Sequence, residues 1–227
     1  MPDAPARFVA DRAVALRERL GRGVSVGISG VDCAGKSTLA EAIRRRLSER
    51  GIPVVLLPGD ELTRPGRERH AEADEGLGYY RDSFDYRAVF EQILPAVRRS
   101  LAGPLTLPAT DWERDAWAER AFELPPSAVV VVEGCFLFAG GRASEFDLSV
   151  WLDLPLEQVV PRALRRPRDL ERMDGPDGVR ERYENRYIPG QRLHLEQDRP
   201  REQATIVVPA DRVGAQAAGN PDATSSA

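Results

Sequence analysis

The chain has 227 residues, of which 42% are hydrophobic and 30% charged, a composition typical of a soluble globular protein with a substantial core. Its two cysteines cannot form a disulfide framework, and its net charge of −4 argues against a dedicated nucleic-acid binder. The apolar run at 128–132 stops at Glu133, and the first ten residues hold an acid and two prolines, so neither a membrane span nor a signal peptide is predicted. We therefore expect a cytoplasmic protein that binds neither nucleic acid nor membrane; a homo-oligomer stays open.

Apolar periodicity and strand composition divide the chain into helices and strands. In the first part of the chain we expect a helix at 5–20, a strand at 24–29, a helix from 37 to about 50 and a strand at 53–58, followed by loops or short helices at 61–84. In the middle we expect a helix at 86–100, a short strand at 105–110, and strands at 128–133 and 148–154. In the last part we expect a helix from 155 to about 166, a polar, turn-rich segment at 167–178, a helix from about 179 to 196 and a strand at 204–209. This order is typical of an α/β domain with a parallel sheet. We expect one domain over 1–213 and a disordered tail at 214–227.

Residues 30–37 (GVDCAGKS) fit the phosphate-binding pattern G-x-x-x-x-G-K-[ST], between a predicted strand and a predicted helix. The glycines permit a tight loop whose N–H groups converge on an anion, while the lysine reaches the outer phosphates and the serine ligates Mg²⁺. Of the 32 lysines and arginines, only Lys36 is a lysine, which indicates a position that needs a compact ammonium. The residues predicted to bind the phosphates of ATP are Gly30, Asp32, Cys33, Ala34, Gly35, Lys36, Ser37 and Thr38.

Other features narrow the class of nucleotide-binding protein. Familiar GTPases read guanine with an N-K-x-D segment, which this chain cannot contain because its lysine lies in the phosphate loop. The sequence has no signature of the LSGGQ type and is short for a remodelling ATPase. A small-molecule kinase is the simplest interpretation.

From the phosphate loop onward the sequence resembles the uridine kinase and phosphoribulokinase branch of the P-loop kinases. The segments that carry the resemblance are 27–38 (GISGVDCAGKST), Asp60, 83–86 (SFDY), 111–112 (DW), 129–134 (VVVVEG), 165–169 (RRPRD) and 204–209 (ATIVVP). The resemblance implies a P-loop three-layer sandwich with a mostly parallel five-stranded sheet, a short arginine-rich lid at about 167–178, and phosphoryl transfer from ATP with Mg²⁺ as cofactor.

Two carboxylates follow predicted strands. Asp60 comes just after the strand at 53–58, where open α/β sheets place their ligands, and the resemblance makes it the base for the acceptor hydroxyl. A loop cap is the alternative, and Glu61 could share the role. Glu133 ends an apolar strand, where an unpaired carboxylate is costly, so it fits a Mg²⁺ ligand together with Ser37. For Glu133 the alternative is an acid that simply reaches solvent.

Three further residues are candidates for acceptor binding beside Asp60. Asp85 matches the position at which the family contacts acceptor hydroxyls, although it also precedes a predicted helix and could be its cap. Tyr86 is an aromatic residue beside this carboxylate, an arrangement that suits a sugar or a ring. Trp112 either lines the acceptor pocket or packs in the core.

Arginines gather between residues 162 and 172. Arg165 and Arg168 match the family's lid best and are predicted to act in catalysis, by neutralising charge on the transferred phosphoryl group. Arg172 is assigned to the acceptor. A solvated helix face is the alternative for the whole cluster.

The chain departs from the family pattern where nucleoside kinases carry Tyr-Asp-Phe and a downstream histidine. Here the residues are Thr110, Asp111 and Trp112, and the two histidines, His70 and His194, are expected to have surface or structural roles rather than catalytic ones. We predict a kinase that transfers the γ-phosphoryl group of ATP to a hydroxyl of a small acceptor, with a uridine-like or cytidine-like nucleoside first. The alternatives are a non-nucleoside metabolite or antibiotic as acceptor, and an ATP-binding regulatory switch without an acceptor.

Overall fold

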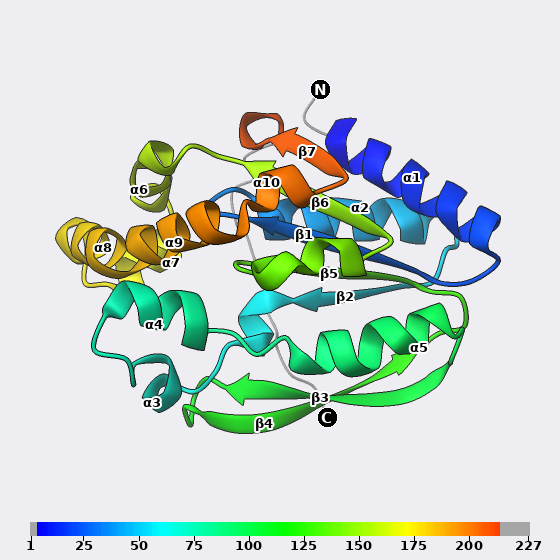
Figure 1. Cartoon of the computed structure of the whole chain (residues 1–227), viewed down its shortest axis with the longest axis horizontal. Helices are drawn as coiled ribbons and strands as arrows, with labels where there is room; N and C mark the ends of the chain where they lie inside the picture. Colours follow the sequence, from blue (N-terminus) through cyan, green and yellow to red (C-terminus); the bar gives the residue numbers. More distant parts are fainter. Residues whose placement is uncertain (1–3, 214–227) are drawn as a thin grey trace.

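A five-stranded sheet forms the centre of the computed structural model, which describes residues 4–213 (Figure 1). The strands lie in the order β2 (Val54–Pro58), β5 (Val129–Gly134), β1 (Val24–Gly30), β6 (Leu148–Asp153) and β7 (Ile206–Pro209). Every neighbouring pair is parallel. The predicted α/β fold with a mostly parallel five-stranded sheet is therefore confirmed, whereas the predicted tail at 214–227 lies outside the described residues.

The register of the three strands β2, β5 and β1 brings their carboxyl ends to one edge of the sheet. Glu133 of β5 lies opposite Pro58 on one side and opposite Ile28 on the other. The loops that leave these strands therefore begin beside one another, which is where parallel sheets of this kind place their ligands.

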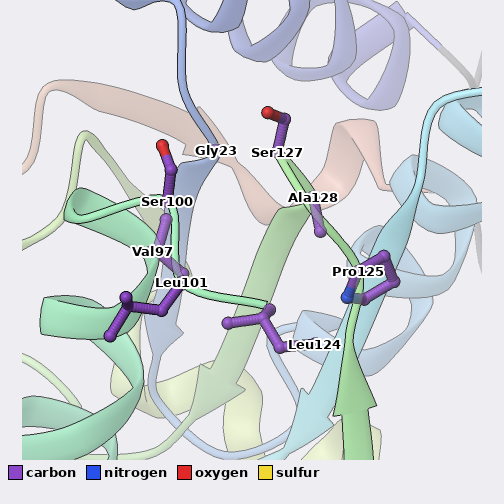
Figure 2. A pocket seen from close by; sticks show the side chains of 8 residues that line it. All are labelled: Gly23, Val97, Ser100, Leu101, Leu124, Pro125, Ser127 and Ala128. Atoms are coloured by element: carbon purple, nitrogen blue, oxygen red, sulfur yellow. The ribbon is translucent and has the colours of Figure 1, made fainter. Parts of the chain in front are cut away.

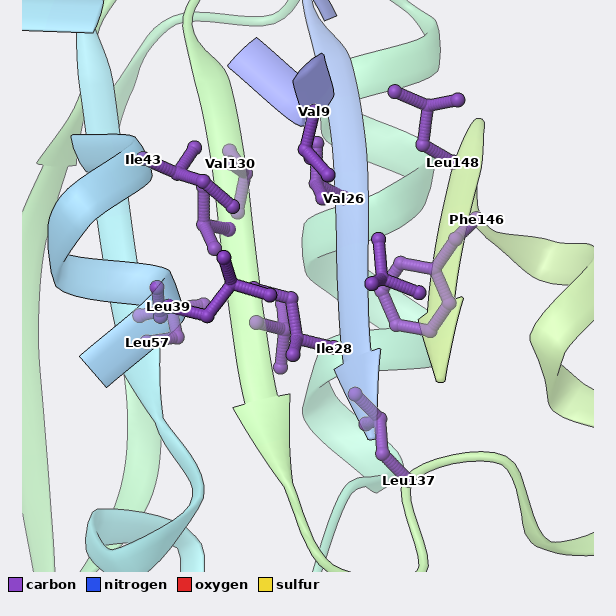
Figure 3. Close-up of a cluster of buried hydrophobic side chains, with 14 of the residues drawn as sticks. Val9, Val26, Ile28, Leu39, Ile43, Leu57, Val130, Leu137, Phe146 and Leu148 are labelled. Carbon is purple, nitrogen blue, oxygen red and sulfur yellow. The ribbon is translucent and has the colours of Figure 1, made fainter. Parts of the chain in front are cut away.

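Helices cover both faces of the sheet. The long helices α1 (Ala4–Leu20) and α2 (Lys36–Glu49) pack on each other, and Figure 3 shows α2 in front of the strands and the helix that contains α5 (Leu94–Arg98) behind them. Burial on both faces explains why the valines of β5 form an apolar run without alternation. β1 is buried on both faces as well, with serine and glycine at its alternate positions. Ile28, Leu39 and Ile43 lie in the resulting core (Figure 3).

The remaining helical segments are short and mostly flank the carboxyl edge of the sheet. They are the 3₁₀ turns Gly59–Leu62, Ala139–Glu145, Leu156–Gln158 and Ala210–Arg212, the π-helical turns Val89–Ile93 and Tyr183–Tyr187, and the helices α3 (Gly66–Arg69), α4 (Glu75–Asp82), α6 (Val159–Ala163), α7 (Pro167–Arg172), α8 (Pro176–Arg182), α9 (Ile188–Asp198) and α10 (Pro200–Gln203). Within residues 4–213 no helix is both long and apolar enough to cross a bilayer.

A separate antiparallel hairpin differs from the sequence prediction. The expected strand at 105–110 is part of a longer strand, β3 (Gly103–Asp111), and β4 (Ala116–Leu124) was not predicted at all. Alanines and charged residues give β4 the composition of a helix, so its strand conformation depends on pairing with β3 rather than on its own propensity.

The segment at 167–178 is also more regular than predicted. Instead of turns alone, it contains α7 and the first part of α8, and each helix has a proline at its first position. Proline is favoured there because its missing N–H has no helical partner and its φ is already helical. The break between the two helices falls at Asp174 and Gly175, which both have positive φ.

Candidate phosphate-transfer site

The phosphate loop connects the end of β1 to the beginning of α2, as its motif predicts. Two of its residues have left-handed backbone, Cys33 with a φ of 60° and Gly35 with a φ of 96°. A glycine at position 35 is needed because a side chain is strained at such a φ. Since α2 begins at Lys36, the positive end of this helix faces the loop.

Lys36 is buried at the centre of the loop. Its ammonium donates hydrogen bonds to the carbonyl oxygens of Gly30 (3.1 Å) and Val31 (2.9 Å). Burial alone lowers the pKa of Lys36, but Cys135, Asp32 and Glu133 raise it more, and the net shift is upward. The side chain therefore carries its positive charge throughout the neutral range.

Ser37 and Glu133 meet at the end of the phosphate loop. The Ser37 hydroxyl donates a hydrogen bond to Oε1 of Glu133 at 2.9 Å. Burial raises the pKa of Glu133, although the nearby charge of Lys36 opposes the shift. A hydroxyl and a carboxylate are hard oxygen donors of the kind that Mg²⁺ takes, so this pair fits the ion. Among the described residues no group of three or more His, Cys, Asp or Glu side chains could hold a metal, so Mg²⁺ here would also need phosphate oxygens and water.

Asp60 lies in the 3₁₀ turn that follows β2, at the same sheet edge as Glu133. Its side chain is 67% exposed, and Nη1 of Arg168 lies 3.7 Å from its Oδ2. Glu133 lies opposite Pro58 at the end of β2, two residues before Asp60, and the charge of Asp60 contributes to the raised pKa of Glu133. The neighbouring Glu61 forms an ion pair with Arg120 on the hairpin instead.

Asp85 and Tyr86 are more deeply placed than an open acceptor site requires. Asp85 is buried, accepts a hydrogen bond from the backbone N–H of Arg87 (3.0 Å) and pairs with its guanidinium at 2.6 Å. Hydrogen bonds from Arg87 outweigh the effect of burial and lower the pKa of Asp85. The Tyr86 hydroxyl donates to the carbonyl of Cys135 at 2.8 Å. The structure thus gives both residues partners inside the fold, and their contact with an acceptor stays a prediction.

The arginines of 162–172 divide into two groups. Arg162 donates to the Cys33 carbonyl at 3.3 Å, and Arg166 lies 3.4 Å from the Cys33 thiol and 3.1 Å from Asp169. Arg165 is exposed, and Arg168 pairs with Asp60 as described above. Arg165 and Arg168 were the arginines predicted to act in catalysis. Within 162–172, the arginines that contact the phosphate loop in the structure are Arg162 and Arg166.

Asp32 of the phosphate loop has partners that the sequence analysis missed. Its carboxylate accepts hydrogen bonds from the hydroxyl of Tyr79 (3.1 and 2.9 Å), the amide of Gln191 (2.9 Å) and the thiol of Cys135 (3.2 Å). The sequence signal for such partners was Asp32 itself, because a carboxylate in a phosphate-binding loop needs hydrogen-bond donors to offset its charge. The sequence does not indicate which residues supply them.

A cavity of about 420 Å³ adjoins this edge and is lined by Asp60, Trp112 and Arg172. Trp112 is 45% exposed, so the alternative that it packs in the core is wrong. A second hollow at the opposite ends of β1 and β5, near Gly23 and Ala128, is too small for a water molecule (Figure 2).

The two histidines lie away from this cavity's lining. His194 is buried in α9 with its Nδ1 2.7 Å from Oδ2 of Asp198, and His70 is exposed beyond α3. This placement agrees with structural roles.

Comparisons with known proteins point to the same class of protein. An adenylylsulphate kinase family model matches residues 22–75. Uridine kinases of Salmonella typhimurium and Salmonella typhi are each 26% identical over 191 residues, which cover 82% of this chain and 86% of the relative. A uridine kinase candidate from Bacillus stearothermophilus has a TM-score of 0.63 at 26% identity, covering 88% of this chain and 98% of the other.

A proposed fructose transport system kinase from Silicibacter shares the fold, with a TM-score of 0.70 at 22% identity over 92% of this chain and 99% of the other. The phosphate loop, the order of the strands and these relatives together make the chain similar to P-loop kinases of the uridine kinase branch.

Proposed function

We propose that the chain transfers the γ-phosphoryl group of ATP to a hydroxyl of a small acceptor. The observation that carries this proposal is the position of Asp60, which lies beside a cavity of about 420 Å³ and close enough to Glu133 to raise its pKa. A phosphate loop alone is compatible with a switch protein. A carboxylate between the phosphate-binding edge and an acceptor-sized cavity favours transfer.

Phosphoryl transfer depends on positioning and charge stabilisation more than on covalent help from the protein. Lys36 and the N–H groups of the phosphate loop bind the phosphates, and Ser37 and Glu133 hold Mg²⁺. Held by Ser37 and Glu133, the ion would supply positive charge that neutralises the phosphates. Asp60 orients the acceptor hydroxyl and takes up its proton at a carboxylate oxygen.

The chain is proposed to be a single domain that acts in the cytoplasm. The segment at about 167–178 is proposed as the lid of this domain. Arg165 and Arg168 are exposed and stand at its beginning. Together with Arg162 and Arg166 near Cys33, they supply guanidiniums to the charge that develops on the transferred group.

A nucleoside is the first candidate for the acceptor. It is supported by the uridine kinases among the relatives, at 26% identity. A non-nucleoside hydroxylated metabolite, or an antibiotic hydroxyl, is the second candidate. It is favoured by the hairpin sequence, in which Thr110 and Trp112 stand where nucleoside kinases carry tyrosine and phenylalanine, with no histidine on the cavity lining.

The test is ADP release from Mg²⁺-ATP against an acceptor panel led by uridine and cytidine and widened to hydroxylated metabolites. Asp60→Asn is compared with Glu61→Gln, because Glu61 is the adjacent acid and pairs with Arg120. We expect stimulation by one acceptor class, loss in Asp60→Asn and retention in Glu61→Gln. ATP binding without stimulation by any acceptor would favour a regulatory switch.

A further inference from the structure

The cavity beside Asp60 is lined by a guanidinium, that of Arg172, which has no ion-pair partner within residues 4–213. The cavity is lined by the carboxylate of Asp60, the indole of Trp112 and the guanidinium of Arg172. A second guanidinium, that of Arg69, lies against the same indole. The charge partners of these groups therefore decide what the cavity can bind.

Arg172 is held in place without a carboxylate partner. Its Cζ lies 5.6 Å from the centre of the Trp112 ring, a cation–π distance. Among the ion pairs within 4.0 Å in residues 4–213, none involves Arg172, whereas the neighbouring Arg168 lies near both Asp60 and Asp169. Stacking on the indole leaves the N–H groups at the edge of the Arg172 guanidinium free to donate.

Arg69 lies against the same indole but does not line the cavity. Its Cζ lies 5.1 Å from the Trp112 ring, and Asp115 approaches one end of its guanidinium at 3.5 Å. The Nε atom of Arg69 is buried and has no hydrogen-bond partner. Because this Nε atom is buried and Arg69 does not line the cavity, Arg69 is assigned to positioning Trp112 and not to contact with the acceptor.

Among the described residues, Asp60 forms no ion pair with Arg172. It interacts with Arg168, and the ammonium of Lys36 is already balanced by Asp32 and Glu133. We propose, on the basis of the phosphotransferase function above, that the acceptor carries an oxyanion, a carboxylate or a phosphate, which Arg172 binds while the acceptor hydroxyl lies at Asp60. Trp112 positions the guanidinium of Arg172. A neutral nucleoside would leave Arg172 without a counter-charge.

The test compares acceptors that share a skeleton and differ in charge: glycerol, glycerate and glycerol phosphate, then ribose and ribose 5-phosphate, with uridine as a neutral reference. Phosphorylation is measured for the parent protein, Arg172→Gln and the matched control Arg180→Gln, whose exposed guanidinium pairs with Asp177 on α8. We expect a charged compound to be the best acceptor, and its kcat/KM to fall about tenfold or more in Arg172→Gln through KM. The KM for ATP stays unchanged, and Arg180→Gln behaves as the parent. The carboxylate and phosphate arms identify the source of the oxyanion.

A binding measurement separates failure of this inference from failure of the kinase function. Calorimetric titration of the same compounds into protein saturated with Mg²⁺-ADP keeps added phosphate off the phosphate loop. If no compound is phosphorylated but a charged one binds the parent and not Arg172→Gln, the oxyanion site stands and the kinase function fails. If uridine surpasses every charged compound, if Arg172→Gln keeps the parent's kcat/KM, or if no charged compound is phosphorylated or bound, the oxyanion site is wrong.

Discussion

The hydroxyl of Tyr79 donates to the carboxylate of Asp32, with oxygen–oxygen distances of 3.1 and 2.9 Å. Burial and the adjacent carboxylate raise the pKa of Tyr79 well above its ordinary value, so it remains a donor at neutral pH. Because Gln191 of α9 donates to the same carboxylate, one acid of the phosphate loop connects α4 and α9 to the nucleotide site. These bonds also offset negative charge beside the phosphates.

Tyr79→Phe is therefore expected to weaken Mg²⁺-ATP binding by about threefold to tenfold, because Asp32 then repels the phosphates more strongly. The expected loss of unfolding free energy is about 1–2 kcal/mol. Tyr80→Phe is the matched control: Tyr80 lies on the same helix, and its hydroxyl donates to Asp198 at 2.6 Å, away from the loop. Calorimetry and urea unfolding measure the two quantities. Equal losses of nucleotide affinity in both variants would contradict the link through Asp32.

Glu133 gives the site a pH dependence of known sign. Burial raises its pKa, so the carboxylate that is proposed to hold Mg²⁺ becomes protonated at a higher pH than an ordinary glutamate. As pH falls through this raised pKa, the activity is expected to fall and the Mg²⁺ concentration needed for half-activity to rise. Glu133→Gln should reduce kcat by about 100-fold or more and lack this titration. An activity profile that is the same in Glu133→Gln would contradict the assignment.

The same group contributes to stability with the opposite trend. A carboxyl whose folded-state pKa lies above its unfolded-state value binds its proton more tightly in the folded protein. Its contribution to the unfolding free energy therefore rises as pH falls from the folded-state pKa toward the unfolded-state pKa. Urea unfolding of the parent and of Glu133→Gln across this interval should diverge in that direction; parallel curves would show that Glu133 has no raised pKa.

Gly134 is required by the close approach of Tyr86. A Cβ at position 134 would lie 2.1 Å from the Tyr86 hydroxyl and 3.1 Å from Cζ of the same ring. Gly134→Ala is therefore expected to lower the unfolding free energy by about 2–3 kcal/mol. Combining it with Tyr86→Phe removes the clashing oxygen, so the double variant should lose less than the sum of the single losses in urea unfolding. Strict additivity would show that the hydroxyl is not the obstacle.

Particular elements show how far the sequence predicts this fold. The valines of β5 are buried on both faces, so their unbroken apolar run predicts the strand. In β4, Glu119, Arg120 and Glu123 lie on a half-exposed hairpin, and no local preference marks the strand because it is stabilised by pairing with β3.

Some residues of the candidate site could likewise be predicted from the local sequence, and others could not. Lys36, Ser37 and Glu133 were predicted because a local motif and a strand end carry their signals. Tyr79 and Gln191 are 47 and 159 residues from Asp32 in sequence, and only the folded chain brings them to it. Arg172 was assigned to the acceptor as one of the arginines of 162–172, while its contact with Trp112 depends on a hairpin that the sequence predicted only in part.

Phosphoryl transfer to an acceptor is tested most directly by detecting the phosphorylated acceptor itself, by mass spectrometry, after incubation with Mg²⁺-ATP. Asp60→Asn should lower product formation by about 100-fold or more with ATP affinity unchanged, because the carboxylate acts on the acceptor hydroxyl and not on the nucleotide. We expect a phosphorylated product whose formation depends on Asp60. ATP binding with no product from any hydroxylated acceptor, or equal product formation in Asp60→Asn, would contradict it.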